Sequence, residues 1–219
     1  MEKLEIMQAR HSVRSYLTKV IEPEKVEALQ KAIDAVNAES GLHVQLFTEE
    51  PEAFDANEAK YGKFNGCKNY FAMVGGKDAD EAIGYYGEKL VLIAQELGLN
   101  TCWVALTYKK AKVTPVIGSG EKLHVIIALG YGENQGVPHK NKPVTELSNL
   151  SDSSPDWFRD GMTAALLAPT AVNQQKFYFE QIGNKVKAKA KLTFYNKMDL
   201  GIAKYHFELG AGKDNFEWI

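Results

Sequence analysis

The sequence predicts an α+β fold, with a mixed or antiparallel sheet flanked by helices. Segments with helical periodicity and short apolar segments follow one another without the regular β-α-β rhythm of a doubly wound sheet. The strongest strand prediction, "KLHVIIALGYG" at 122–132, is apolar nearly throughout, as expected for a central strand. The chain has 219 residues, of which 45% are hydrophobic, so it can bury a large core. We therefore expect a single domain over 1–219.

Five segments are predicted to be helical, and their ends carry recognisable signals. Pro23 begins one of them, at a position where a missing N–H is tolerated. Another opens with acidic residues, which suit the positive end of a helix dipole, and Gly98 suits its left-handed C-cap. Pro169 should end a further helix near Ala168, because the residue before a proline disfavours helical geometry. The predicted helices cover 2–9, 23–39, 78–98, 155–168 and 199–212.

Alternating or continuously apolar segments predict the strands. Residues 186–192 ("VKAKAKL") alternate and could pair with the strand that precedes them. Residues 48–68 are polar and are predicted to form a loop with a short helix. The predicted strands cover 43–47, 69–76, 122–132 and 176–182, and 101–106 is expected to be a short buried segment.

Two stretches near the ends of the chain share one plan. "AIDAVNAESGLHVQLF" (32–47) and "ALLAPTAVNQQKFYF" (165–179) each run from a helix through a bend with an Asn into an alternating strand. The similarity suggests two pseudo-symmetric halves in one chain. We place them at 1–150 and 151–219.

Composition and short motifs exclude several classes of protein. A net charge of −2 argues against general nucleic-acid binding, which needs a basic excess. The apolar runs are too short to span a bilayer, and the N-terminus lacks the apolar core of a secretory signal. Cys67 and Cys102 make no disulfide framework, so we expect a cytoplasmic protein with reduced thiols. The sequence contains no metal-ligand motif and no Walker loop, so no metal is expected.

The segment "RHSVR" concentrates positive charge in a chain that is otherwise not basic. Arg10, His11 and Arg14 surround the hydroxyl of Ser12. Guanidinium groups bind phosphate oxygens bidentately, so one interpretation is a phosphate site. The other is a solvated surface cluster, and composition alone gives both about equal weight.

Three further segments could carry function. "LGLNTCW" (97–103) joins a helix to a buried segment through a glycine turn, although an ordinary C-cap explains it as well. Its Cys102 precedes apolar residues and is expected to be a buried, inert thiol. "APTAVNQQKF" (168–177) is more polar than helix termination requires, and Asn173 offers both a donor and an acceptor for a heterocycle edge. Lys140 and Lys142 in "HKNKP" could bind phosphate, but a solvated loop is the default interpretation.

Together these segments resemble the FMN-dependent nitroreductase family. The family carries an Arg-x-Ser-x-Arg motif, a "GLGTCW"-like turn, an "IGYP"-like strand end and a Lys/Arg-Lys-Pro segment. This chain has "RHSVR", "GLNTCW", "LGYG" and "KNKP" in the same order. The family's "AP(S/T)xxNxQPW" segment normally follows the first motif, whereas its counterpart here, "APTAVNQQKF", lies at 168–177. The pattern is similar to a subgroup in which one chain mimics the usual two-chain assembly.

The resemblance implies one FMN per chain. Arg10, His11, Ser12 and Arg14 would hold its phosphate and ribityl end, with Lys140 or Lys142 assisting. Pro169, Thr170, Ala171 and Asn173 would line the isoalloxazine. Val104 and Ala105 match positions whose backbone faces the flavin near N5, with Ala105 in place of the usual Gly.

The resemblance also implies a flavin oxidoreductase. NAD(P)H would reduce the flavin, and a nitroaromatic, a quinone or a similar acceptor would then be reduced in a ping-pong cycle. No catalytic side chain is required, and a monomer could suffice, although a homo-oligomer is compatible. Two alternatives are a flavin-binding protein without turnover, for storage or sensing, and a non-enzymatic relic of the fold.

Overall fold

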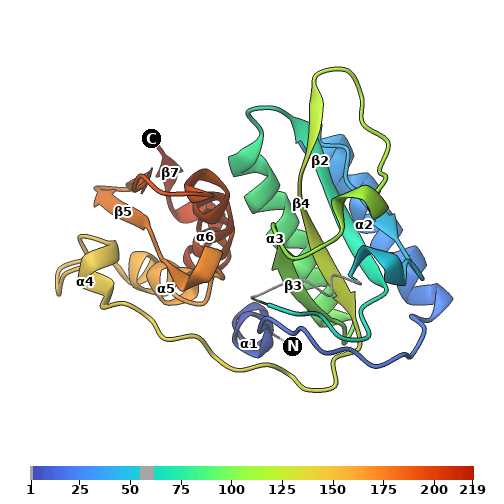
Figure 1. Cartoon of the computed structure of the whole chain (residues 1–219). Helices are drawn as coiled ribbons and strands as arrows, with labels where there is room; N and C mark the ends of the chain where they lie inside the picture. Colours follow the sequence, from blue (N-terminus) through green and yellow to red (C-terminus); the bar gives the residue numbers. More distant parts are fainter. Residues whose placement is uncertain (1, 55–61) are drawn as a thin grey trace. The chain divides into compact units, whose positions relative to one another are not determined.

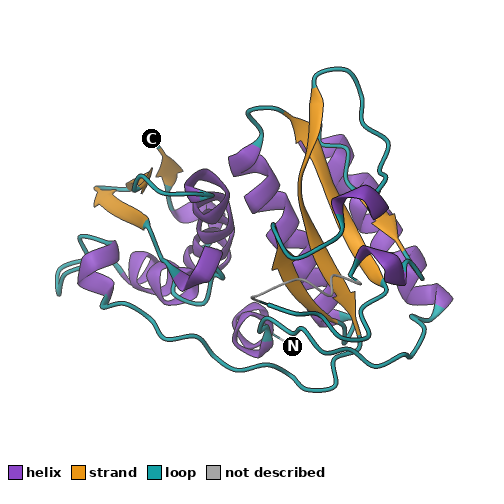
Figure 2. Cartoon of the chain, in the orientation of Figure 1, coloured by secondary structure: helices purple, strands orange, loops and turns teal. Residues whose placement is uncertain are grey.

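The computed structural model describes residues 2–54 and 62–219, and it divides the chain into two compact units. Unit 1 combines Met1–Gln8, Asp80–Lys89 and Pro138–Ile219. Unit 2 combines Ala9–Ala79 and Leu90–Val137. Figure 1 labels the helices and strands, and Figure 2 distinguishes them by type.

Unit 2 is built on a four-stranded antiparallel sheet. Its strand order is β1-β2-β4-β3, and each neighbouring pair runs antiparallel. The predicted central strand becomes β4, which lies inside the sheet between β2 and β3, so that prediction is confirmed. The strands are β1 (Gln45–Phe47), β2 (Asn69–Gly76), β3 (Asn100–Val104) and β4 (Glu121–Gly130).

The helices beside this sheet bury one apolar stripe each. Helix α2 (Pro23–Ser40) begins at Pro23, as predicted, and ends at Gly41 with a left-handed backbone, φ 70°. Its buried residues recur at helical spacing and are Leu29, Ile33 and Val36. Helix α3 (Asp80–Glu96) contributes its last part to unit 2 and its first part to unit 1. Short 3-10 turns cover Pro51–Ala53 (η1) and Lys110–Lys112 (η2).

Unit 1 packs helices against a small sheet of order β5-β6-β7. Strands β5 (Phe177–Ile182) and β6 (Lys185–Ala190) form the predicted antiparallel pair, and β7 (Glu217–Trp218) joins β6 in parallel. Its core is aromatic, with Phe158, Phe177, Phe179 and Phe207 fully buried. The helices are α1 (Lys3–Ala9), α4 (Val144–Leu147), α5 (Asp156–Ala165) and α6 (Asn196–Ala211), with 3-10 turns η3 (Ala171–Asn173) and η4 (Lys213–Asn215).

Glycines allow the first part of α3 to approach α6 at backbone distance. A Cβ atom built on Gly84 would lie 2.0 Å from the carbonyl oxygen of Met198, and one on Gly201 would lie 2.0 Å from that of Glu81. Polar side chains of α3 and α6 also pair with each other at this contact. The imidazole Nε2 of His206 lies 2.9 Å from Oε1 of Glu88, and both side chains are fully buried. Lys204 also forms an ion pair with Glu81 at 2.7 Å.

The structure confirms the predicted α+β fold class and departs from the sequence-based elements at a few places. Strands lie in two sheets rather than one, and neither α4 nor β7 was predicted, because both are too short to show periodicity. Helix α5 ends at Ala165, before the predicted Ala168, since the following turn already tightens through the Leu167 N–H to Ala164 carbonyl bond of 2.9 Å. Part of the predicted 48–68 loop lies outside the described residues.

Within the described residues, no helix combines the length and the apolar character needed to cross a membrane.

Candidate functional site

In unit 2, three segments far apart in the sequence meet at the N-terminal cationic segment. Ser12 pairs with Thr101 at the start of β3, and the Val13 N–H donates to the Thr101 carbonyl at 3.0 Å. Tyr16 pairs with Gly132, just beyond β4. The motifs "RHSVR", "NTCW" and "LGYG" are therefore brought together by backbone hydrogen bonds.

Burial distinguishes the side chains of this segment. Val13 is 1% exposed and Tyr16 is 2% exposed, and both belong to the hydrophobic core of unit 2. Ser12 and Arg14 are exposed, whereas Arg10 is buried. The core thus anchors the segment through Val13 and Tyr16, while Ser12 and Arg14 stay accessible.

Cys102 shows that the two guanidinium groups act at one place. Burial raises the pKa of its thiol, and the nearby charges of Arg14 and Arg10, together with a hydrogen bond from Ser12, oppose that rise. The charges of both guanidinium groups therefore act on the same buried thiol. Cys102 itself is 2% exposed with a raised pKa, which confirms the expected buried thiol and gives it no nucleophilic role.

The loop after β4 fits closely against the cationic segment. Gly136 has φ 70°, and a Cβ atom built on it would lie 2.7 Å from the His11 Cβ and 3.1 Å from the Ser12 carbonyl oxygen. Asn100 holds the same loop, because its Oδ1 accepts the Gly132 N–H at 3.0 Å and its Nδ2 donates to Gln135 at 3.0 Å. Sequence reasoning missed Asn100, whose only signal was its place at the end of a glycine turn.

Val104 and Ala105 mark the far end of β3. Val104 is the last residue of the strand and is buried. Ala105 follows it outside the strand and is half-buried. The peptide groups at this end of β3 are therefore less enclosed by the sheet than those at its centre.

In unit 1, the "HKNKP" and "APTAVNQQKF" segments lie against each other. The Lys140 carbonyl accepts hydrogen bonds from Asn173 Nδ2 and Gln175 Nε2, both at 2.8 Å. The Lys142 ammonium donates to the carbonyls of Gln174 at 2.6 Å and Gln175 at 3.3 Å. Two segments more than thirty residues apart thus form one polar cluster.

We call residues 169–175 the bend, and its backbone conformation is unusual. Val172, Asn173 and Gln175 have φ values of 46°, 53° and 45°. The left-handed region costs a residue with a side chain about 1–2 kcal/mol, and a β-branched residue such as Val is least suited to it. Such conformations persist where surrounding contacts fix them, and they concentrate at functional sites.

Asp199 supplies one such contact from the first turn of α6. Its Oδ1 accepts the Ala171 N–H at 3.0 Å, and its Oδ2 accepts Gln174 Nε2 at 2.7 Å. On the other side of the bend, the Thr170 hydroxyl accepts the Gln175 N–H at 3.0 Å. Sequence reasoning noted the polarity of "NQQ" but missed Asp199, which joins the bend only through the fold.

The structure therefore brings the sequence-predicted residues together in two groups, one in each unit. The first group combines the cationic segment with the end of β3, and the second combines the two lysines with the bend. In unit 2 these are Arg10, His11, Ser12, Arg14, Val104 and Ala105, and in unit 1 they are Lys140, Lys142, Pro169, Thr170, Ala171 and Asn173.

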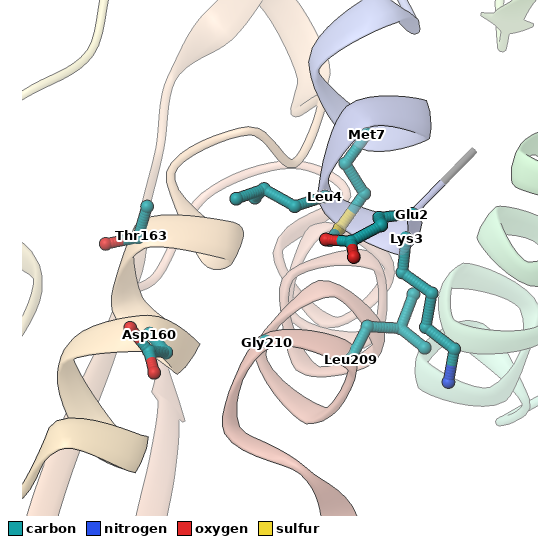
Figure 3. Close-up of a pocket in the computed structure, with 8 residues that line it drawn as sticks. All are labelled: Glu2, Lys3, Leu4, Met7, Asp160, Thr163, Leu209 and Gly210. Atoms are coloured by element: carbon teal, nitrogen blue, oxygen red, sulfur yellow. The ribbon is translucent and has the colours of Figure 1, made fainter.

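Figure 3 shows a pocket elsewhere in unit 1, at the contact of α1 with α5 and α6. Its volume is about 620 Å³, and none of the sequence-predicted residues lines it. Acidic, basic and apolar side chains share its wall without a cluster of one chemical kind. The lining residues are Glu2, Lys3, Leu4, Met7, Asp160, Thr163, Leu209 and Gly210.

No group of three or more His, Cys, Asp or Glu side chains within residues 2–54 and 62–219 is arranged to hold a metal ion.

Fold and site together define a nitroreductase-like α+β protein. A family model described as "Putative TM nitroreductase" matches residues 2–211. The chain therefore belongs to this nitroreductase family, which makes it an oxidoreductase by class. No curated protein matches the chain.

Solved structures share the fold at low sequence identity. A nitroreductase from Thermotoga maritima is 24% identical, covers 98% of this chain and 85% of its own, and has a TM-score of 0.66. A Desulfovibrio desulfuricans structure described as a nitroreductase in complex with FMN is 19% identical, with 70% and 98% coverage and a TM-score of 0.53. A structure described as an NADH oxidase from Clostridium acetobutylicum is 19% identical, with 68% and 99% coverage and a TM-score of 0.50.

Proposed function

We propose that this protein is an FMN-dependent NAD(P)H oxidoreductase. The observation that carries the proposal is the meeting of "RHSVR" with "NTCW" and "LGYG", which gathers two guanidinium groups beside Cys102. Like charges held close together repel each other, and an anionic ligand would offset that repulsion. A phosphate monoester is such a ligand.

The donors of unit 2 fit the phosphate and ribityl end of FMN. Arg10 and Arg14 carry two charges that match the dianionic phosphate, and planar guanidinium groups bind its oxygens bidentately. His11 and the exposed Ser12 hydroxyl add neutral hydrogen bonds for the phosphate or the ribityl hydroxyls. Lys140 is the better of the two lysines for assisting, because the Lys142 ammonium already donates to two backbone carbonyls.

The bend suits the polar edge of the isoalloxazine. The Asn173 amide uses one N–H on the Lys140 carbonyl and accepts one hydrogen bond from Gln175. It can still offer a second N–H and a second lone pair to a ring edge with alternating donors and acceptors. Pro169, Thr170 and Ala171 would contact the ring, and Val104 with Ala105 would present backbone near N5.

The flavin, when bound, supplies the redox chemistry, in which NAD(P)H is oxidised and a nitroaromatic, quinone or similar acceptor is reduced in turn. The protein's residues bind and orient the reactants, and backbone N–H groups near N5 stabilise developing negative charge. No side chain is assigned a covalent or acid–base role. The names of the Desulfovibrio and Clostridium structures, which mention FMN and NADH oxidase, support this choice of cofactor and donor.

We further propose that the protein acts in the cytoplasm and without a nucleic-acid partner. The Desulfovibrio structure covers 98% of itself but only 70% of this chain, whereas the Thermotoga structure covers 98% of this chain. Part of this chain thus has no counterpart in the shorter protein.

The proposal is tested by flavin binding. Purified wild-type protein should bind about one FMN per chain, and added NADH or NADPH should bleach it under anaerobic conditions. Replacing both arginines, Arg10→Ala with Arg14→Ala, should weaken FMN binding at least about a hundredfold, since two charge-assisted contacts are lost. Fluorescence titration of the apoprotein with FMN measures the change.

A charge-matched control separates the site from the net charge. Lys31→Ala with Lys77→Ala removes two positive charges from exposed positions of α2 and of the turn after β2, and should leave FMN affinity unchanged. Equal FMN affinity in the double-arginine variant and the wild type would contradict the phosphate assignment. A bound flavin that neither NADH nor NADPH reduces would favour the flavin-binding alternative without turnover.

A further inference from the structure

The bend needs a contact that fixes it, because its own sequence does not favour its backbone. Val172, Asn173 and Gln175 all have positive φ, and none of them is a glycine. Val172 is 65% exposed, so packing of its side chain does little to hold it in place. The conformation must be held by hydrogen bonds to the peptide groups and side chains on either side.

Asp199 is placed to hold both ends of the turn η3. One carboxylate oxygen accepts the Ala171 N–H at the start of this turn, and the other accepts Gln174 Nε2 just after it, at 3.0 and 2.7 Å. Gln174 is fixed in turn, because its Nε2 also donates to the Phe194 carbonyl at 2.9 Å and its Oε1 accepts the Thr193 hydroxyl at 2.8 Å. The carboxylate therefore closes a network that spans the bend.

This carboxylate is buried, and N–H donors contact both of its oxygens. The Asp199 side chain is 3% exposed, and burial raises its pKa to about 6, while the bonds from Gln174 and Ala171 oppose the rise. The Lys142 ammonium, which contacts the bend, binds the carbonyls of Gln174 and Gln175 rather than this carboxylate. Burying a carboxylate costs free energy. Its presence at a point where two N–H donors contact it points to a role in holding those donors.

We propose that Asp199 is a positioning residue that holds the bend in its flavin-binding conformation. This inference rests on the proposed function, because it assigns a positioning residue to the same proposed flavin site. Asp199 does not touch the reactants and acts through the Ala171 backbone and the Gln174 side chain. Stabilisation of the helix dipole by an acidic residue in the first turn does not explain the contacts, since that effect requires no bond to the bend.

The first test uses the apoprotein and does not depend on flavin. Protonation of Asp199 turns one acceptor oxygen into a donor, which cannot pair with the N–H groups it faces. In NMR spectra of the wild type, the Ala171 amide and the Gln174 side-chain amide should titrate with one shared midpoint near pH 6. In Asp199→Asn both titrations should disappear, and exchange of the Ala171 amide with solvent should accelerate at least about tenfold.

The second test measures flavin affinity across pH. At pH 7.5 Asp199→Asn should weaken FMN binding about tenfold, because the new Nδ2 donor faces the Gln174 donor. The ratio of the variant Kd to the wild-type Kd should fall toward one as the pH drops to 5. At that pH the wild-type carboxyl group is protonated, so it also presents a donor where the variant presents its amide N–H. Titration of the FMN phosphate cancels in this ratio. Asp214→Asn, which changes an exposed aspartate of η4, should match the wild type at each pH.

The outcomes separate the two proposals. Absence of any titration at Ala171 or Gln174 in the wild type between pH 5 and 8 would overturn the positioning role, even if Asp199→Asn fails to fold. A folded Asp199→Asn with wild-type amide exchange and a Kd within twofold of the wild type would overturn it as well. If no form of the protein binds FMN but the titration and the exchange change occur, the proposed function fails and the role of Asp199 in shaping the bend stands.

Discussion

At the scale of single residues, the Glu88–His206 pair shows how buried polar groups of unit 1 are satisfied by hydrogen bonds. Nδ1 of His206 lies 3.1 Å from the Ala164 carbonyl, which can only accept, so Nδ1 carries a proton. Nε2 lies 2.9 Å from Glu88, and both side chains are 0% exposed. The pair therefore satisfies both ring nitrogens at a fully buried position.

Removing one member of this pair should be costly. We predict that Glu88→Ala lowers the free energy of unfolding by about 3–5 kcal/mol, because it leaves a polar ring buried without its partner. Glu88→Gln should lose clearly less, since its amide can still bond Nε2. Urea unfolding followed by circular dichroism measures both, with the exposed helix substitution Glu27→Ala as a reference within about 0.5 kcal/mol of the wild type. Equal losses for Ala and Gln would contradict the hydrogen-bond explanation.

Prediction from sequence reached some of these residues and not others. "RHSVR" could be found because three side chains that can carry a positive charge stand within five positions, around a hydroxyl. Asp199 and Asn100 could not, because their partners lie in other segments, as with Asp199 and Ala171. A sequence pattern reports neighbours along the chain, whereas these contacts depend on how helices and loops meet.

At the scale of elements, long periodic segments were predictable and short ones were not. Helix α3 and strands β2 and β4 follow the predicted ranges closely, because burial imposes a pattern on many successive residues. Strand β7 has two residues, and its extended conformation depends on parallel pairing with the edge of β6. The division of the strands into two sheets also depends on tertiary contacts, which leave no periodicity behind.

The glycine contact between α3 and α6 gives a prediction at this scale. We predict that Gly84→Ala destabilises the protein by about 1–3 kcal/mol or more, because the new methyl group meets the Met198 carbonyl, a backbone atom that cannot rotate away. Gly76→Ala is the matched control, since a Cβ atom there meets nothing within 4 Å and its φ is not in the left-handed region. Thermal unfolding of both variants provides the comparison, and a Gly84→Ala protein as stable as Gly76→Ala would contradict the close contact.

At the scale of the whole molecule, the chain passes between the two units several times. Unit 1 draws on the N-terminus, on the first part of α3 and on everything from Pro138 onward. The halves predicted from sequence, 1–150 and 151–219, rest on the repeated plan and stay a prediction. A linear sequence shows repeats readily, but it does not show that one helix can serve two compact units.

This organisation predicts the behaviour of a fragment. Residues 138–219 expressed alone should not unfold cooperatively, because His206 would lack Glu88 and α6 would lack the backbone contact with Glu81 and Gly84. Near-ultraviolet circular dichroism and amide dispersion in NMR should show a loosely packed chain. A sharp unfolding transition in the fragment would contradict the assignment of residues 80–89 to unit 1.

The pairing of Ser12 with Thr101 also has a consequence for synthesis on the ribosome. The cationic segment leaves the exit tunnel early, while the strand that receives it is translated 89 residues later. At about 5–20 residues per second, that interval lasts roughly 4–18 s. During it the two arginines are carried by a nascent chain without their β-sheet partner. Pairing of the cationic segment with β3 must therefore follow translation of at least the first 101 residues.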